Sequence, residues 1–274
     1  MYPTTCRGIT LVLYFVLGLS LPAGAESLLI GGTGSSEPLM KLLFQEFSKQ
    51  SPGLNLTVVS PSLGSGGGIK ALSVGKIDLA VTARPLKTAE ATVLGQHFEW
   101  AATPFVLATN GGKRQNGFAL DELAAVYEGR LKTWDNATPI RLVLRTRDDS
   151  DTTQLKSMSP AMDKAVVIAD QRPGMVYGND DMDTLELLTR TAGALGPTTL
   201  GFLRTMDSRL TVLPINGVMP SVAGLKEGSY PWRKTLTVVL PLKASPAAVK
   251  FTEFIRSGKA SEVMLRYDYL PAGP

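Results

Sequence analysis

The fold of this chain is decided by the stretch Ser27-Leu-Leu-Ile-Gly-Gly-Thr-Gly-Ser-Ser-Glu-Pro38, which joins a strand to a helix through a loop of glycines and hydroxyl groups. Its apolar start, Ser27–Ile30, predicts a short buried strand, and the glycines after it predict a tight turn. Glu37-Pro38 predicts the first turn of a helix, where the missing N–H of proline breaks no hydrogen bond. A helix N-terminus directly after a strand is a ready site for an anion.

The same alternation continues downstream, with a strand expected over 54–60, a loop over 61–68, a helix over 69–74 and a strand over 77–81. Strands that alternate with helices pair in parallel, because each helix brings the chain back to the edge where the strand began. This part of the chain therefore predicts an α/β architecture.

A second unit of the same kind follows. Its pattern predicts strands over 105–109 and 140–144 and helices over 120–127, 161–171 and 183–190. Near the end of the chain, the pattern predicts a strand over 235–240 and one or two helices within 246–266. Two α/β units predict two lobes with a cleft between them, one formed by residues 26–104 plus 232–274 and the other by residues 105–231. Ligands of open α/β sheets bind beyond the carboxyl ends of the strands, so we expect the site in the loops that follow them.

The composition excludes several classes of protein. The 274 residues are 44% hydrophobic, which is enough apolar surface for a folded core rather than a disordered chain. One cysteine and one histidine rule out a disulfide framework, Cys-rich zinc sites and two-histidine zinc motifs. The formal net charge of +4 is spread along the chain, without the Lys/Arg blocks that would indicate a nucleic-acid partner. We expect no metal and no cofactor.

Residues 1–25 have the pattern of a secretory signal peptide. Arg7 is followed by an apolar run over 9–21, and Ala23-Gly-Ala25 supplies the small residues of a cleavage site after Ala25. An N-terminal membrane anchor is the alternative, but this run is shorter than the roughly 20 residues that a spanning helix needs. Cleavage would remove Cys6 and leave an exported, periplasmic chain without a thiol.

Four loops at expected strand ends carry groups that bind anions. Gly34-Ser-Ser36 and Gly64-Ser-Gly-Gly-Gly68 each lead into a helix, so their amides and hydroxyls can converge on one anion. Arg84 follows a strand, and Arg145 begins a polar loop over 145–153; a guanidinium can clamp an oxyanion with two hydrogen bonds. Simpler readings stay open for each loop: a serine that caps a helix, a flexible linker, an arginine paired with an acid, or a solvated loop.

Together these motifs resemble the PstS-like phosphate-binding proteins of ABC importers, members of the type II periplasmic binding protein superfamily. The most specific part is residues 64–80, which read G-S-G-G-G-I-K-A-L-x-x-G-x-x-D-L-A, followed by A-R-P-L at 83–86. Val126-Tyr-Glu-Gly-Arg-Leu-Lys-Thr-Trp134 and Gly193-Ala-Leu-Gly196 are similar to two further segments of the family. The resemblance extends over nearly all of the chain that follows the signal peptide.

The resemblance implies a two-lobed periplasmic-binding-protein fold, in which each lobe is a mixed, mostly parallel sheet flanked by helices. It implies a non-catalytic protein that captures phosphate or a related oxyanion in the cleft and delivers it to an ABC permease in the inner membrane. We expect this protein to be a monomer. The ligand-binding residues that the resemblance implies are Ser35, Ser36, Ser65, Gly66, Arg84, Arg145, Ser150 and Thr152.

Several positions depart from the family pattern. Ala83 stands where phosphate-specific members carry an aspartate that accepts the phosphate proton. The loop that contains Arg145, Ser150 and Thr152 resembles the R-x-x-x-S-G-T ligand loop of the family, but Asp151 stands in place of its glycine. Glu37 adds negative charge beside the first loop. These departures keep open an accessory or signalling receptor with altered ligand preference. A secreted hydrolase is a second alternative, but the single histidine, His97, has no G-x-S-x-G partner and is expected to be structural or on the surface.

Overall fold

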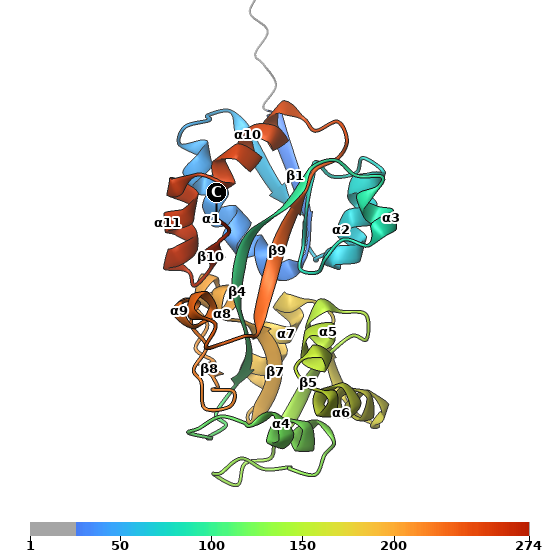
Figure 1. Ribbon diagram of the computed structural model, residues 1–274, viewed down its shortest axis with the longest axis vertical. Coiled ribbons are helices and arrows are strands. Elements are labelled where there is room, and N and C mark those ends of the chain that lie inside the picture. The colour runs from blue at the N-terminus through green and yellow to red at the C-terminus, as the bar shows by residue number, and fades with distance from the viewer. Residues whose placement is uncertain (1–25, 274) are drawn as a thin grey trace, which may run out of the picture.

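The computed structural model describes residues 26–273, and its ten strands form one hydrogen-bonded sheet through the molecule (Figure 1). Along the main path of the sheet the strands are β2 (Leu54–Val58), β1 (Glu26–Gly32), β3 (Leu79–Thr82), β9 (Arg233–Val239), β4 (His97–Thr109), β7 (Ala194–Thr199), β5 (Arg141–Arg145) and β6 (Val176–Gly178). Two short strands, β8 (Thr211–Val212) and β10 (Leu270–Pro271), pair with β4. The expected signal peptide lies outside the described residues.

Helices cover both halves of this sheet. One half carries the short 3-10 helix η1 (Gly34–Ser36) and helices α1 (Glu37–Ser48), α2 (Gly64–Ser73), α3 (Thr88–Ala91), α10 (Pro246–Ile255) and α11 (Gly258–Arg266). The other half carries α4 (Leu120–Tyr127), α5 (Ser150–Ser157), α6 (Pro160–Gln171), α7 (Asp181–Arg190), α8 (Leu200–Thr205) and α9 (Val222–Glu227). Within residues 26–273, none of these helices is both long enough and apolar enough to cross a membrane.

The half that contains the described N-terminus, which we call lobe 1, pairs its first strands as the sequence predicts. β1 pairs in parallel with β2 and with β3, and β9 then pairs antiparallel to β3. Side chains alternate between the two faces of a strand, so Leu28 and Ile30 pack with α1, α10 and α11 while α2 packs on the opposite face (Figure 1). This places the N-termini of η1 and α2 at the carboxyl ends of the parallel strands.

The other half, lobe 2, repeats the arrangement, with β5 between β6 and β7 as β1 lies between β2 and β3. β5 pairs in parallel with β6 and β7, and β7 pairs antiparallel to β4. Leu142 and Leu144 of β5 pack against the face covered by α4 and α6, whereas Val143 packs with residues of α7 and α8. The carboxyl end of β5 therefore points toward lobe 1, with α5 following it.

Strand β4 joins the two lobes, and it is longer than the sequence indicates. The strand expected over 105–109 begins at His97, because residues 97–104 pair with β9 and residues 105–109 pair with β7. Trp100 and Ala101 belong to the core of lobe 1, whereas Phe105 and Leu107 belong to a core of lobe 2. The lobe boundaries proposed from the sequence stay a prediction, and the hydrophobic cores separate within this one strand.

Two expected loops prove to be largely helical. Helix α2 begins at Gly64 rather than at Ile69, so the glycine-rich segment is its first turns. A Cβ on Gly68 would lie 2.6 Å from the Cα of Gly32, so the glycine allows α2 to approach β1 closely. The loop expected over 145–153 ends early as well, because Asp149 caps α5 and the helix begins at Ser150.

Candidate functional site

A cavity of about 700 Å³ lies between the two lobes, and we call it the cleft. Lobe 1 lines it with Thr33, residues 62–66, Arg84 and Lys87, and lobe 2 lines it with residues 145–150, Thr153 and residues 179–181. Five of the eight predicted ligand residues line this cavity: Ser65, Gly66, Arg84, Arg145 and Ser150. The structure therefore brings together loops from both lobes that are distant in sequence.

Ser35 and Ser36 lie behind the wall of the cleft rather than on its surface. Both side chains are buried in η1, and the Ser36 hydroxyl donates to the carbonyl oxygen of Thr33 at 2.9 Å. The Ser35 hydroxyl lies 3.2 Å from that of Thr33, and the Tyr269 hydroxyl donates to the Ser35 carbonyl. At this place the cavity is lined by Thr33. The two serines hold the shape of the turn, and their role toward a ligand stays a prediction.

Ser65 occupies the second position of α2, at the helix N-terminus that faces the cleft. Its Oγ accepts a hydrogen bond from the Ala83 amide at 3.0 Å, which ties α2 to the end of β3. Because this contact uses the oxygen as acceptor, the hydroxyl proton can still be donated to an anion. The next residue, Gly66, leaves its side of the helix open, since a Cβ there would meet only the Arg84 guanidinium, at 3.9 Å.

Arg84 lines the cleft as part of an ion pair. Its Nη1 and Nη2 donate to the two carboxylate oxygens of Glu90 at 2.8 Å and 2.7 Å, and Nη1 also reaches the Pro85 carbonyl. The two hydrogen bonds from this guanidinium lower the pKa of Glu90 to about 2. Arg84 therefore fits the paired alternative raised by its sequence, and an anion would have to share the guanidinium with Glu90.

Arg145 is the last residue of β5, and its side chain is almost fully buried at the cleft. Its guanidinium donates to Asp149 at 2.8 Å and to the Thr184 hydroxyl at 2.7 Å. Carboxylate oxygens of Asp151 and Asp181 lie 3.8 Å and 3.7 Å from its nitrogens. Burial opposes the charged form, but the three carboxylates outweigh it and raise the pKa of Arg145.

The first turn of α5 carries the other two predicted ligands. Ser150 is half-buried and lines the cleft, whereas the Thr152 hydroxyl donates to the carbonyl oxygens of Arg145 and Thr146 and points away from it. The Asp149 carboxylate caps the helix by accepting from the Asp151 amide at 2.7 Å. An internal carboxylate thus occupies part of the helix N-terminus where the sequence predicts an anion.

Lys234 is a buried cation of this region that sequence analysis missed. It lies near the start of β9, and its ammonium forms an ion pair with the Asp151 carboxylate. Period-two alternation places Lys234 on the same face as Leu236 and Val238, both of which are buried. That pattern was the available signal, because a lysine in register with a buried apolar face requires a buried partner.

Burial and neighbouring charges act together on this cluster, which consists of Arg145, Lys234, Asp149, Asp151 and Asp181. For Lys234, burial opposes the ammonium, but the three carboxylates prevail and raise its pKa. For Asp149, burial opposes the carboxylate, but Arg145 and Lys234 prevail and lower its pKa. For Asp151, burial and two neighbouring carboxylates raise the pKa. With all five groups ionised, the carboxylates outnumber the cations.

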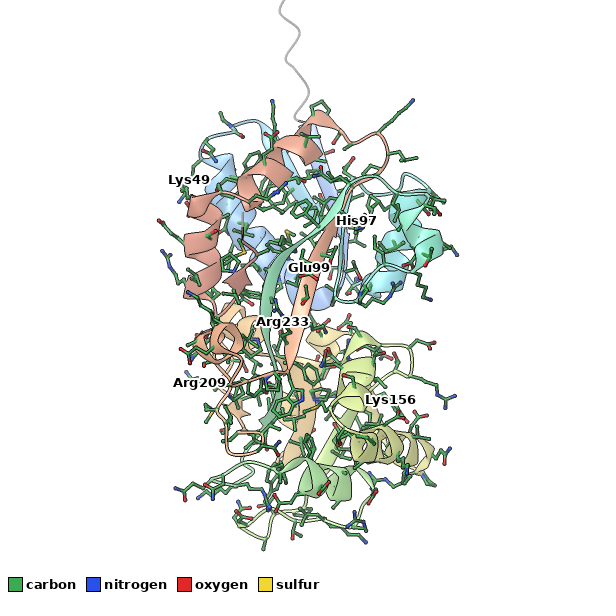
Figure 2. The ribbon with its side chains drawn as sticks, viewed as in Figure 1. Lys49, His97, Glu99, Lys156, Arg209 and Arg233 are labelled. Carbon is green, nitrogen blue, oxygen red and sulfur yellow. The ribbon has the colours of Figure 1, made fainter. Side chains whose placement is uncertain are left out.

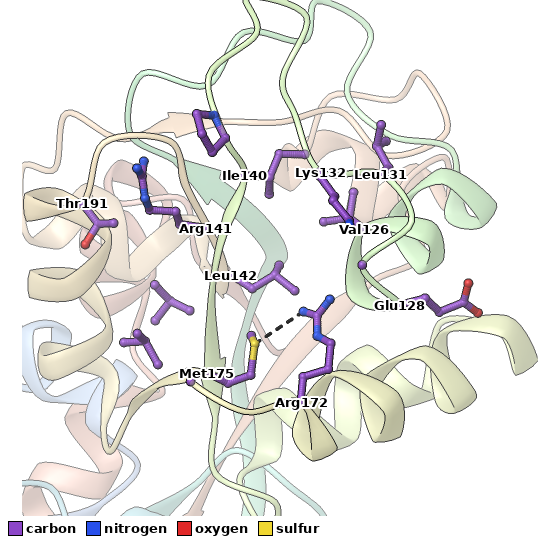
Figure 3. A pocket seen from close by; sticks show the side chains of 15 residues that line it. Val126, Glu128, Leu131, Lys132, Ile140, Arg141, Leu142, Arg172, Met175 and Thr191 are labelled. Carbon is purple, nitrogen blue, oxygen red and sulfur yellow. Dashed lines mark hydrogen bonds between the residues drawn. The ribbon is translucent and has the colours of Figure 1, made fainter.

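The remaining candidate features lie elsewhere. His97 is exposed at the start of β4, as expected, and lies well away from the cleft (Figure 2). A second cavity, of about 610 Å³, opens at the far end of lobe 2 between the end of α4 and the start of β5 (Figure 3). Its floor is mainly apolar, and Arg172 contacts the Met175 sulfur there. Among residues 26–273, no group of three or more His, Cys, Asp or Glu side chains is arranged to hold a metal ion.

Comparison with known proteins supports the same fold. A family model described as a PBP superfamily domain matches residues 20–259. The phosphate-binding protein PstS of Bacillus subtilis strain 168 is 25% identical over 237 residues, which cover 84% of this chain and 75% of that protein.

Solved structures agree with this assignment. A phosphate ABC transporter substrate-binding protein from Clostridium perfringens, solved with bound phosphate, has a TM-score of 0.76 at 17% identity and covers 90% of this chain and 100% of its own. An ABC-type phosphate transport receptor from Vibrio cholerae has a TM-score of 0.62 at 20% identity and covers 89% and 99%. The two-lobed α/β fold and the resemblance to PstS-like proteins are confirmed. Since the family model spans most of the chain, this protein belongs to the PBP superfamily, and its relatives are substrate-binding proteins rather than enzymes.

Proposed function

We propose that this protein captures phosphate or a related oxyanion in the cleft and delivers it to an ABC importer. The observation that carries the proposal is the cleft itself, where the N-terminus of α2 with Ser65 in lobe 1 faces Arg145 in lobe 2. Hydroxyl and amide donors from one lobe and a guanidinium from the other match an oxyanion, which accepts hydrogen bonds on all sides. The relatives named above bind phosphate, which makes it the first ligand to test.

We further propose a working mechanism of closure. The lobes, residues 26–104 with 232–274 and residues 105–231, would approach each other around the strands that join them as the anion replaces its water shell with protein donors. The exported chain, cleaved after Ala25, would act as a periplasmic monomer and present the closed form to the permease. Ser35, Ser36 and Thr152 would contribute by shaping the turns that carry the direct ligands.

Calorimetric titration of the purified protein with inorganic phosphate tests this function. We expect saturable binding and a rise in melting temperature. Substituting Ser65→Ala removes a hydrogen bond to a charged ligand and is expected to weaken binding by about 10- to 100-fold. Ser73→Ala, at the exposed end of the same helix, is the matched control and should leave affinity unchanged. Absence of heat and of thermal shift with phosphate up to millimolar concentration would overturn the proposal.

An accessory or signalling receptor is the second candidate, and a specific observation favours it. The three arginines of the cleft already have carboxylate partners within the chain: Glu90 for Arg84, Asp149 for Arg145 and Asp170 for Arg147. A receptor that had changed its ligand would be expected to satisfy its cations in this way. Retention of phosphate in the purified protein, seen by native mass spectrometry, would favour the transport role instead.

A further inference from the structure

One carboxylate crosses from lobe 2 to the anion-binding turn of lobe 1. Asp181 is the first residue of α7, and its side chain is buried in the wall of the cleft. Its Oδ2 lies so close to η1 that a Cβ on Gly34 would be 2.8 Å from it. The same oxygen is 3.7 Å from Nη2 of Arg145. The carboxylate thus lies between the guanidinium and the turn that the sequence predicts to bind an anion.

The two neighbouring carboxylates, Asp149 and Asp151, have structural roles that Asp181 does not have. Asp149 caps α5 and hydrogen-bonds Arg145 directly, while Asp151 is paired with the buried ammonium of Lys234. Helix α7 is already capped by Asp180, whose side chain accepts from the Asp183 amide. Asp181 is therefore not needed to cap its own helix. Its contact with Arg145, at 3.7 Å, is longer than that of Asp149, at 2.8 Å, whereas Asp151, at 3.8 Å, is held by Lys234, so Asp181 is the easiest of the three carboxylates to displace.

An entering oxyanion would meet this carboxylate at close range. Two negative charges a few ångströms apart repel strongly when both are shielded from water, so an anion that uses Arg145 must displace Asp181 or accept its repulsion. The same carboxylate already places a negative charge in the cleft, because it offsets Arg145 and lies against the turn of lobe 1.

We propose that Asp181 is a built-in competitor for the anion and sets the affinity of the cleft. Its carboxylate holds the position between Arg145 and Gly34, and phosphate binds by displacing it. This inference rests on the proposed function, because it concerns the same cleft and the same class of ligand. With this competitor the protein binds phosphate more weakly than the donor groups alone would, and it releases phosphate more readily.

The test is a titration with inorganic phosphate of the wild-type protein, Asp181→Asn and Glu186→Gln at one pH and ionic strength. Asp181→Asn keeps the shape of the side chain and removes its charge, so we expect phosphate to bind about 10- to 100-fold more tightly. Glu186 is exposed on the same helix, so Glu186→Gln removes one negative charge outside the cleft and is expected to change affinity by less than about threefold. Thermal denaturation verifies folding, and Asp181→Ser replaces Asp181→Asn if that variant does not fold.

The outcomes separate this inference from the proposed function. If the wild type binds phosphate and Asp181→Asn binds it equally well or more weakly, the proposed role of Asp181 as a competitor is overturned. The proposal of phosphate capture is then retained. Binding by Asp181→Asn alone supports the competitor and overturns phosphate capture by the natural protein. If neither protein binds phosphate, both proposals are wrong. An equal gain in Glu186→Gln would show a general charge effect and would also overturn the specific role of Asp181.

Discussion

The two walls of the cleft present charge in opposite ways. The wall from lobe 1, formed by residues 62–66 and Arg84, offers a helix N-terminus, a hydroxyl and one arginine whose pairing with Glu90 is partly exposed. The wall from lobe 2 is built on a buried cluster in which Arg145 is enclosed by three carboxylates, one of which also pairs with Lys234 of β9 in lobe 1. Both walls look polar in the sequence, but their charges differ in how much water surrounds them.

That difference decides what each charge contributes. An exposed ion pair exchanges hydration for a contact of similar strength, so its net contribution to stability is small. A buried ion has lost its hydration, so removing its partner leaves a charge that nothing compensates. We therefore expect the wall from lobe 2 to depend on its charges and the wall from lobe 1 to depend on close packing of its backbone.

The largest effect is expected from Lys234→Met, which removes the partner of the buried Asp151 carboxylate. We expect a loss of about 3–5 kcal/mol in the free energy of unfolding, measured by urea denaturation. The double variant Lys234→Met/Asp151→Leu removes both charges and should recover most of that loss. A single variant within about 1 kcal/mol of the wild type would mean that the pair is not desolvated, and the contrast between the walls would fail.

The next effect concerns packing in lobe 1. Gly68→Ala would place a methyl group against the backbone of Gly32, and we expect it to destabilise the protein by about 1–3 kcal/mol. Gly66→Ala is the matched control in the same helix, because its Cβ meets no backbone there. That variant should stabilise by about 0.4–1 kcal/mol, since alanine restricts the unfolded chain. Equal results for both variants would argue against a close contact between α2 and β1.

Breaking the ion pair of lobe 1 should have a smaller effect. Arg84→Gln removes the partner of Glu90, and because both side chains keep contact with water we expect a loss of at most about 1 kcal/mol. The measurement is the same urea denaturation used for Lys234→Met, so the two ion pairs are compared directly. A loss as large as that of Lys234→Met would show that this pair is as enclosed as the cluster.

The smallest effect is the pH dependence of that pair. The folded-state pKa of Glu90, about 2, lies below its ordinary value of 4.5 because Arg84 favours the carboxylate. The stabilisation is therefore fully present above about pH 4.5 and is lost as the pH falls toward 2. The difference in stability between the wild type and Glu90→Gln should be constant from pH 6 to 8 and shrink below about pH 4.5. A difference that grows on acidification would contradict this assignment.

Local patterns predicted some elements closely and misjudged others. The helix expected over 120–127 forms with those bounds, since its apolar residues have helical spacing and its first turn is acidic. The glycines at 64–68 indicated a loop because glycine lowers helix propensity, yet the tertiary contact with Gly32 favours a helix there. Five of the eight predicted ligand residues line the cleft. Thr152 does not, although its neighbour Thr153 does.

Local sequence was enough to predict the alternation of strands and helices, the parallel pairing of β1 with its neighbours, and the loops that would meet at one edge. These follow from residue types within a few positions of each other, and they suffice to indicate the family. Which charges pair depends on the packed fold, because Lys234 and Asp151 are 83 residues apart and meet only after β9 and α5 come together at the lobe boundary. Burial makes that pairing matter, and burial is a property of the packed molecule that local sequence does not contain.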